Sequence, residues 1–236
     1  MLDIIGAVFA TALYVTVVGV LVGLAPLSAS ARLAAYAAAA AWLGIIVAVA
    51  ALGGLAPGVL GPIPANLLPF VALLAFLFGC WYLAPRFRNA LFAVPLPALI
   101  AVHAGRIGGI FFLLLNADGR LSAPFAPSAG VGDMITGAAA IVLAAILVLG
   151  FEMRRAWLHA WNAFGALDLV VAVVLGVLSA PGTPFRVFTD GPGTAAMTGL
   201  PWVFVPAMLV PLFLLIHLAI AAKLRTAAET HRLALA

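Results

Sequence analysis

The chain alternates between long apolar runs and short separators rich in Pro, Gly, Ser or charge. A helix needs about 20 mostly apolar residues to cross the hydrocarbon core of a bilayer. Runs of that kind span residues 4–24, 33–55, 66–84, 91–115, 131–151, 160–180 and 200–222. The pattern predicts an all-α polytopic transmembrane bundle with seven spans in one domain. Within it we expect a three-helix apolar scaffold (1–89), four helices that carry intramembrane polar residues (90–222) and a polar tail (223–236).

The composition narrows the class of protein. Apolar and aromatic residues make up 67% of the 236 positions and charged residues 8%, against roughly 45–50% and 25% in a typical soluble domain. A soluble enzyme, a nucleic-acid binder and a disordered tail are therefore excluded. The expected partner is the lipid bilayer, with a homo-oligomer or a membrane partner left open. The single cysteine, Cys80, allows no intramolecular disulfide.

Basic residues predict the orientation, because short cytoplasmic loops carry an excess of Lys and Arg. With the N-terminus outside, the outer segments hold two basic residues, Arg120 and Arg186. The inner segments hold Arg32, Arg86, Arg88, Arg154, Arg155, Lys223, Arg225 and Arg232. We therefore expect a cytoplasmic C-terminus and long outer loops at 116–130 and 181–199. A cleaved signal peptide is disfavoured, since no Lys or Arg precedes the first apolar run.

Arg106 lies deep inside the fourth apolar run. An Arg at the centre of a spanning helix costs about 2.5–3.5 kcal/mol on insertion scales, so its side chain should face the bundle and be paired. The candidate partners are Asp133 and Asp168. From the predicted helix ends, Arg106 lies about 22 Å from the inner face, Asp168 about 12 Å and Asp133 about 27 Å. Both partners stay open, as does a purely structural ion pair.

Other polar residues gather in the same four predicted helices. His103 precedes Arg106 by three residues and shares its helix face. Asn162 and Asp168 flank Gly165 at intervals of three, which predicts a polar and small-residue stripe. His217 is expected nearer the inner end of the last span. Because His103 and His217 are expected at different depths, they match poorly as axial haem ligands, and no cofactor or metal is predicted.

Prolines mark where the predicted helices break. Pro95 and Pro97 lie near the inner end of the fourth span, and Pro206 and Pro211 lie inside the last. Each proline removes a backbone donor and leaves a carbonyl that needs another partner in the membrane. Broken helices beside intramembrane charges are typical of transporter sites, although kinks that only shape packing would give the same pattern.

Several chemistries find no support in the residues. A retinal protein needs a lysine within its last span, and the single lysine, Lys223, lies at the end of that span. There is no GxSxG nucleophile motif, no HExxH zinc motif and no phosphate-binding glycine loop. An enzyme is therefore the least favoured class.

The segments HAGRIGGIFFLL, APSAGVGDMITG, WNAFGALDLVVAVVLGVLSAPG and GLPWVFVPAMLVPLFLLIHL resemble an uncharacterised family of small bacterial polytopic membrane proteins. The resemblance covers roughly residues 90–222. It implies a bacterial inner membrane and says nothing about a substrate.

Two functions remain in competition. The first is a transporter of a small solute or ion, with proton coupling as one form, built on Arg106, Asp168 and Asp133. The second is a non-catalytic membrane subunit that binds a partner or lipid and has a structural Arg–Asp pair. A carrier of haem or metal through His103 and His217 comes third.

Overall fold

The computed structural model describes the backbone of residues 1–233 and the side chains of residues 1–226, and residues 1–233 contain helices and no strand. The α-helices are α1 (Leu2–Gly23), α2 (Ala29–Ala51), α3 (Leu67–Leu83), α4 (Pro85–Ala93), α5 (Leu96–Ala101), α6 (Ile110–Ala117), α7 (Phe125–Val148), α8 (Arg155–Leu178) and α9 (Val210–Leu233). Three segments wind differently: the 3-10 helices η1 (Val102–Gly109) and η2 (Ala195–Thr198), and the π-helical η3 (Val205–Leu209).

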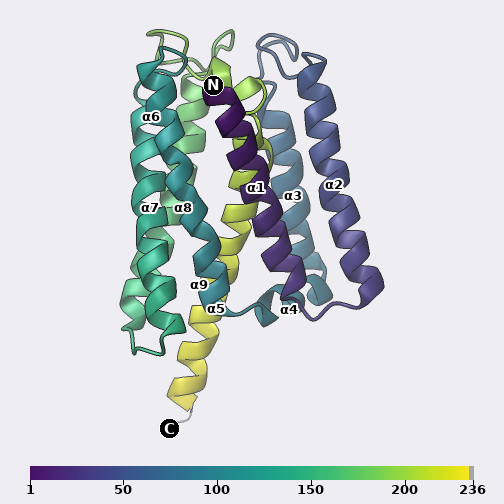
Figure 1. The fold of residues 1–236 in the computed structure, drawn as a ribbon, viewed down its shortest axis with the longest axis vertical. Helices are drawn as coiled ribbons and strands as arrows, with labels where there is room; N and C mark the ends of the chain where they lie inside the picture. Colours follow the sequence, from purple (N-terminus) through teal and green to yellow (C-terminus); the bar gives the residue numbers. More distant parts are fainter. Residues whose placement is uncertain (234–236) are drawn as a thin grey trace.

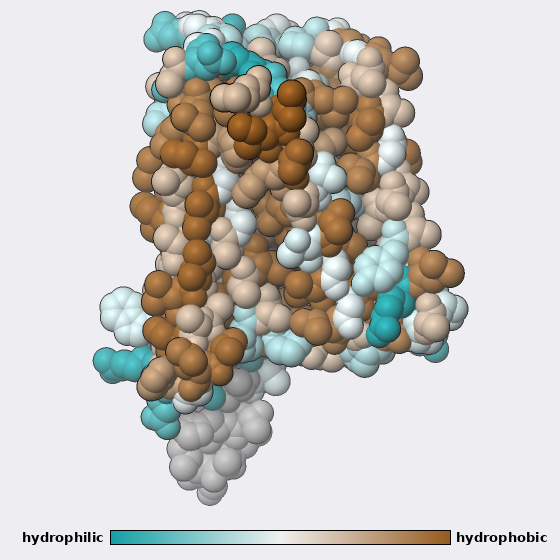
Figure 2. Space-filling model, in the orientation of Figure 1, coloured by the Kyte–Doolittle hydropathy of each residue, from teal (hydrophilic) through white to brown (hydrophobic). Residues whose placement is uncertain are grey.

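Within residues 1–233, six helices are long and apolar enough to cross a membrane, or up to seven if α3 and α4, which meet at 94°, form one broken span. Apolar side chains cover the flank of the bundle in Figure 2, and polar ones gather toward its two ends. By length and composition the chain is therefore compatible with a protein that crosses a membrane several times.

The helices run alongside one another between two ends (Figure 1). The N-terminal face carries Met1 and the loops around 52–66, 118–124 and 179–200, and the C-terminal face carries the end of α9. The span Val205–Thr226 is the most enclosed, with 67% of its most apolar window buried, against 6% for α2. The last span therefore forms the centre of the bundle, and α2 lies at its edge.

The segment 85–95 differs from the sequence prediction of a loop leading into a span at residue 91. Pro85 begins the short helix α4, which suits a proline because the first turn needs no N–H from it. The Lys223 ammonium donates to the carbonyl of Phe92 at 2.5 Å and so satisfies an orphan acceptor at the end of α4. The next span then begins at Leu96.

The predicted long loop 116–130 is wrong, because α7 begins at Phe125. Pro127 is tolerated there in the first helical turn. Gly130, which in sequence suggests a loop, packs against η1 instead: a Cβ at Gly130 would lie 2.9 Å from the carbonyl oxygen of Gly109. Asp133 consequently lies about two turns inside the helix rather than at its end.

The four prolines that were expected to break helices occupy two kinds of position. Pro95 precedes α5 and Pro97 lies in its first turn, so both stand at a helix start. Pro206 lies within η3, and Pro211 is the second residue of α9. The irregular winding of the last span thus coincides with its prolines.

Trp42 of α2 supports this irregular segment. Pro211 has no N–H, so it cannot donate to the carbonyl of Ala207, four residues earlier. The Trp42 indole N–H donates to that carbonyl oxygen at 3.0 Å. A peripheral helix thereby supplies the donor that the proline removed, as the interior of a membrane demands.

We predict that Trp42→Phe destabilises the protein by about 1–3 kcal/mol, because a buried carbonyl loses its donor. Thermal unfolding in detergent micelles measures the loss. Pro211→Ala restores a backbone N–H at the right place, so Trp42→Phe should cost clearly less in that background. Equal losses in both backgrounds would show that the indole hydrogen bond is not what Trp42 contributes.

Candidate functional site

Arg106 lies at the centre of the bundle, with 3% of the residue exposed, and each of its guanidinium nitrogens has a partner. Its Nε donates to Asp133 Oδ1 at 2.6 Å, and Nη2 donates to Asp168 Oδ2 at 2.5 Å. Nη1 donates to the carbonyl of Gly165 at 3.0 Å and to His217 Nε2 at 3.1 Å. One side chain from η1 is therefore bonded to α7, α8 and α9 together.

The two alternative partners of Arg106 are thus both bound. The predicted depth gap between Asp168 and Arg106 came from misplaced helix ends. With α8 beginning at Arg155 and α5 at Leu96, Asp168 lies about 20 Å and Arg106 about 15–20 Å from the C-terminal face. Asp133, measured from the end of α7, lies about 22 Å from that face. The three charges therefore share one level.

The hydrogen bonds fix the tautomer of His217. A guanidinium can only donate, so the His217 Nε2 that it contacts is the acceptor. The proton of the neutral ring then resides on Nδ1, which donates to Asn162 Oδ1 at 2.9 Å. The Asn162 amide in turn donates to the backbone carbonyl of His217 at 3.1 Å. Asn162 therefore orients the imidazole that the guanidinium faces.

His103 contacts the cluster through its ring face. It is fully buried, and neither ring nitrogen makes a hydrogen bond to any residue that the structure describes. Its ring centroid lies 4.2 Å from that of His217, 4.9 Å from that of Phe213 and 5.3 Å from that of Trp161. Of these residues, His103 and Trp161 lie toward the C-terminal face, because they precede Arg106 and Asp168 in helices that start there.

The expectation that His103 and His217 lie at different depths is wrong, since their rings are in contact. The last span runs over Val205–Thr226, so His217 is near its middle rather than its inner end. Two imidazoles packed this closely leave no room for a macrocycle between them. Among the described residues, no three of His, Cys, Asp and Glu converge as a metal-binding group. The absence of a cofactor stays a prediction.

Small residues let the helices approach the charges. A Cβ at Gly132 would overlap the Asp168 carboxylate, and one at Gly165 would lie 2.7 Å from the His217 ring and 2.8 Å from Thr136 Cγ2. Gly165 belongs to the stripe found in the sequence. The role of Gly132 was missed, because it lies only two residues beyond a segment predicted to be a loop and near prolines that suggest irregular structure.

Thr136 is a second residue that sequence reasoning missed. Its carbonyl accepts the Trp161 indole N–H at 3.1 Å, and its buried hydroxyl has no hydrogen-bond partner within the described part of the chain. A threonine in an apolar helix carries no pattern that distinguishes it from a packing residue, so no signal in the sequence could have found it.

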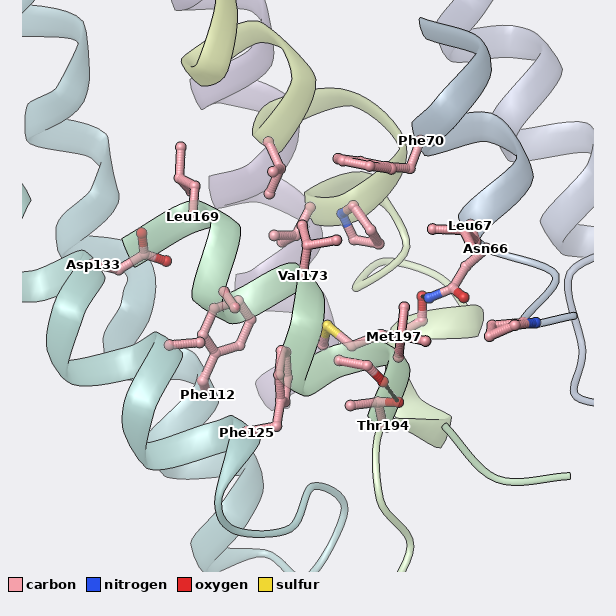
Figure 3. Close-up of a pocket in the computed structure, with 18 residues that line it drawn as sticks. Asn66, Leu67, Phe70, Phe112, Phe125, Asp133, Leu169, Val173, Thr194 and Met197 are labelled. Atoms are coloured by element: carbon pink, nitrogen blue, oxygen red, sulfur yellow. Dashed lines mark hydrogen bonds between the residues drawn. The ribbon is translucent and has the colours of Figure 1, made fainter. Parts of the chain in front are cut away.

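Two cavities meet at Asp133. One, of about 70 Å³, extends from Asp133 to Asn66 and Thr194 near the N-terminal face (Figure 3). The other, of about 50 Å³, lies between α1, η1 and η3 and is lined by Arg106 and Asp133. The side chain of Asp133 is 15% exposed and that of Asp168 is 9% exposed. Of the two carboxylates, Asp133 is the one that lines both cavities.

Residues 63–225, more than half of the chain, match the family model described as a domain of unknown function, DUF8737. The chain belongs to this family. No curated protein and no solved structure matches it. The DUF8737 segment holds the whole Arg106 cluster and begins just before α3, so α1 and α2, with Trp42, lie outside it.

We predict that Gly132→Ala destabilises the protein by about 1–3 kcal/mol or more, because the added methyl group must displace the Asp168 carboxylate from its place beside Arg106. Gly79→Ala in α3 is the matched control, since a Cβ there would meet nothing within 4 Å. Thermal unfolding of the two variants in the same detergent makes the comparison. Equal transition temperatures would contradict the packing described for Asp168.

Proposed function

We propose that this DUF8737 protein is a transporter of a small solute or ion in the bacterial inner membrane, coupled to protons. The observation that carries the proposal is the charge count of the cluster: one guanidinium is hydrogen-bonded to two carboxylates. In this proposal the chain crosses the membrane seven times, with the N-terminus outside. The basic residues at the C-terminal face, including Arg86 and Arg154, support that orientation.

The charge count leaves one negative charge in excess when both carboxylates are ionised. Such a charge is costly inside a membrane, where water does not stabilise it. A proton shared by the carboxylates, or a bound cation, would bring the cluster to neutrality. Such a site must gain and lose a proton or a cation. That exchange can be coupled to the movement of a solute across the membrane.

The access to the cluster is unequal on its two sides. Asp133 borders a cavity that reaches Asn66 and Thr194 near the N-terminal face. Toward the other face, the rings of His103 and Trp161 pack edge to face, with centroids 5.3 Å apart. Access from one side at a time is what a carrier requires.

The last span provides an element that can rearrange. Its π-helical turn η3 and Pro211 interrupt the regular hydrogen bonding beside the cavity, and Val205, Pro206 and Val210 line that cavity. π-Turns and proline breaks inside helices are frequent at functional sites. We propose that η3 moves between the two access states.

A second candidate is a non-catalytic membrane subunit. The hydrogen bonding of Arg106 favours it, because every guanidinium nitrogen has a partner and together these bonds tie η1 to α7, α8 and α9. In that case Arg106→Ala would lower stability in detergent and recovery of a stoichiometric partner, with no flux to lose.

Proton flux in proteoliposomes tests the proposal. With a pH-sensitive dye inside the vesicles, candidate solutes should drive proton movement through the wild type. Asp168→Asn should lower this flux by about tenfold or more, because the remaining Arg106–Asp133 pair is balanced and needs no mobile charge. Asp133→Asn should act in the same way.

Asp118→Asn is the matched control, because Asp118 lies exposed in the turn after α6 and should leave the flux unchanged. Thermal unfolding confirms that each variant is folded. Wild-type vesicles that give the same signals as Asp168→Asn vesicles, across solutes and pH gradients, would overturn the transporter and favour the subunit.

A further inference from the structure

We infer that the larger cavity binds a small alkylammonium ion, with its ammonium group against Asp133 and its alkyl chain along the apolar walls. The inference rests on the proposed function and names the substrate class of the same site. It is drawn from the charge at one end of the cavity, the chemistry of its walls and its size.

Asp133 presents an unused acceptor to the cavity. Its Oδ1 accepts from Arg106, whereas its Oδ2 accepts no hydrogen bond from the described residues. The carboxylate belongs to a cluster with two acidic groups and one guanidinium, so it offers both an acceptor and surplus negative charge. A primary ammonium group supplies the matching positive charge and three N–H donors.

The walls select against a hydrated inorganic ion. Between Asp133 and the far end, the cavity is lined by aromatic and aliphatic side chains: Phe70, Phe112, Phe125, Leu169, Val173 and Val177. Figure 3 shows Phe112, Val173 and Phe125 between Asp133 and Asn66. A metal cation requires several oxygen ligands, and the cavity offers one carboxylate beside these walls. An alkyl chain gains free energy from the same surface.

The size of the cavity limits the chain length. At roughly 10–15 Å³ for each water-sized sphere, a cavity of about 70 Å³ holds about five such spheres. This corresponds to an amine of about four or five heavy atoms beyond the charged nitrogen. Asn66 and Thr194 at the far end mark where a longer chain would meet polar groups (Figure 3).

Calorimetric titration of the purified full-length protein with n-butylammonium chloride tests the site. We expect saturable binding at least tenfold tighter than that of 1-butanol, which has the same alkyl chain without the charge. Asp133→Asn should weaken butylammonium binding at least tenfold and leave 1-butanol unaffected. Asp118→Asn should bind like the wild type.

Gly176→Leu tests the cavity independently of the charge. A Cβ at Gly176 would meet the Phe125 ring at 3.6 Å, an ordinary contact, so α8 accepts a side chain there. The leucine should fill the space beside Phe125 and weaken butylammonium binding at least tenfold, with Asp133 and Arg106 intact. Unchanged binding in this folded variant would overturn the assignment of the ligand to the cavity.

Other outcomes separate this inference from the proposed function. Equal binding of 1-butanol and butylammonium would show an apolar or lipid-chain pocket and overturn the inference, as would potassium chloride competing with the amine. No amine binding, together with Asp168-dependent proton flux for another solute, would overturn the inference and keep the transporter. Asp133-dependent amine binding without any proton flux would support the ligand site and overturn the transporter.

Discussion

The bonding of the Arg106 guanidinium is the constraint around which the bundle is arranged. A buried arginine is costly in a membrane, and hydrogen bonds to its donors lower that cost; among the described residues, four of the five N–H donors of Arg106 have acceptors. Here the acceptors come from α7, α8 and α9, which therefore must approach η1 closely. This requirement explains the glycines. A side chain at Gly132 would overlap the Asp168 carboxylate, and one at Gly165 would crowd the His217 ring.

The bonding of Arg106 also explains how the site can be rigid and still bind and release a ligand. Asn162 and Gly165 hold fixed positions through backbone and side-chain hydrogen bonds. Asp133, in contrast, uses one carboxylate oxygen for Arg106 and borders both cavities. Arg106 and Asp168 join the helices and lie away from the larger cavity. Asp133 borders that cavity, so it is the group that can meet a ligand.

The lengths of the apolar runs were enough to predict the helical class and most spans, because hydrocarbon thickness sets the length of a crossing helix. The cost of an intramembrane charge was enough to select Arg106 with its two aspartates. What could not be read were helix ends near Pro85 and Phe125, since Pro and Gly favour loops in isolation but suit a first turn or a close helix contact. The ends that decide depth were also misplaced: α5 begins at Leu96, α8 begins at Arg155 and the last span ends at Thr226. The level of Asp168 and the contact between His103 and His217 were therefore misjudged.

The sharing of one guanidinium by two carboxylates is tested most directly by a thermodynamic cycle of Asp133→Asn and Asp168→Asn. Unfolding free energies in detergent would be measured for the two single variants and the double variant. Each single variant keeps one balanced ion pair, so we expect small changes, within about 1 kcal/mol of the wild type. The double variant leaves Arg106 buried without a counterion, and we expect it to lose about 3–5 kcal/mol. A double variant whose loss equals the sum of the two small single losses would contradict the account.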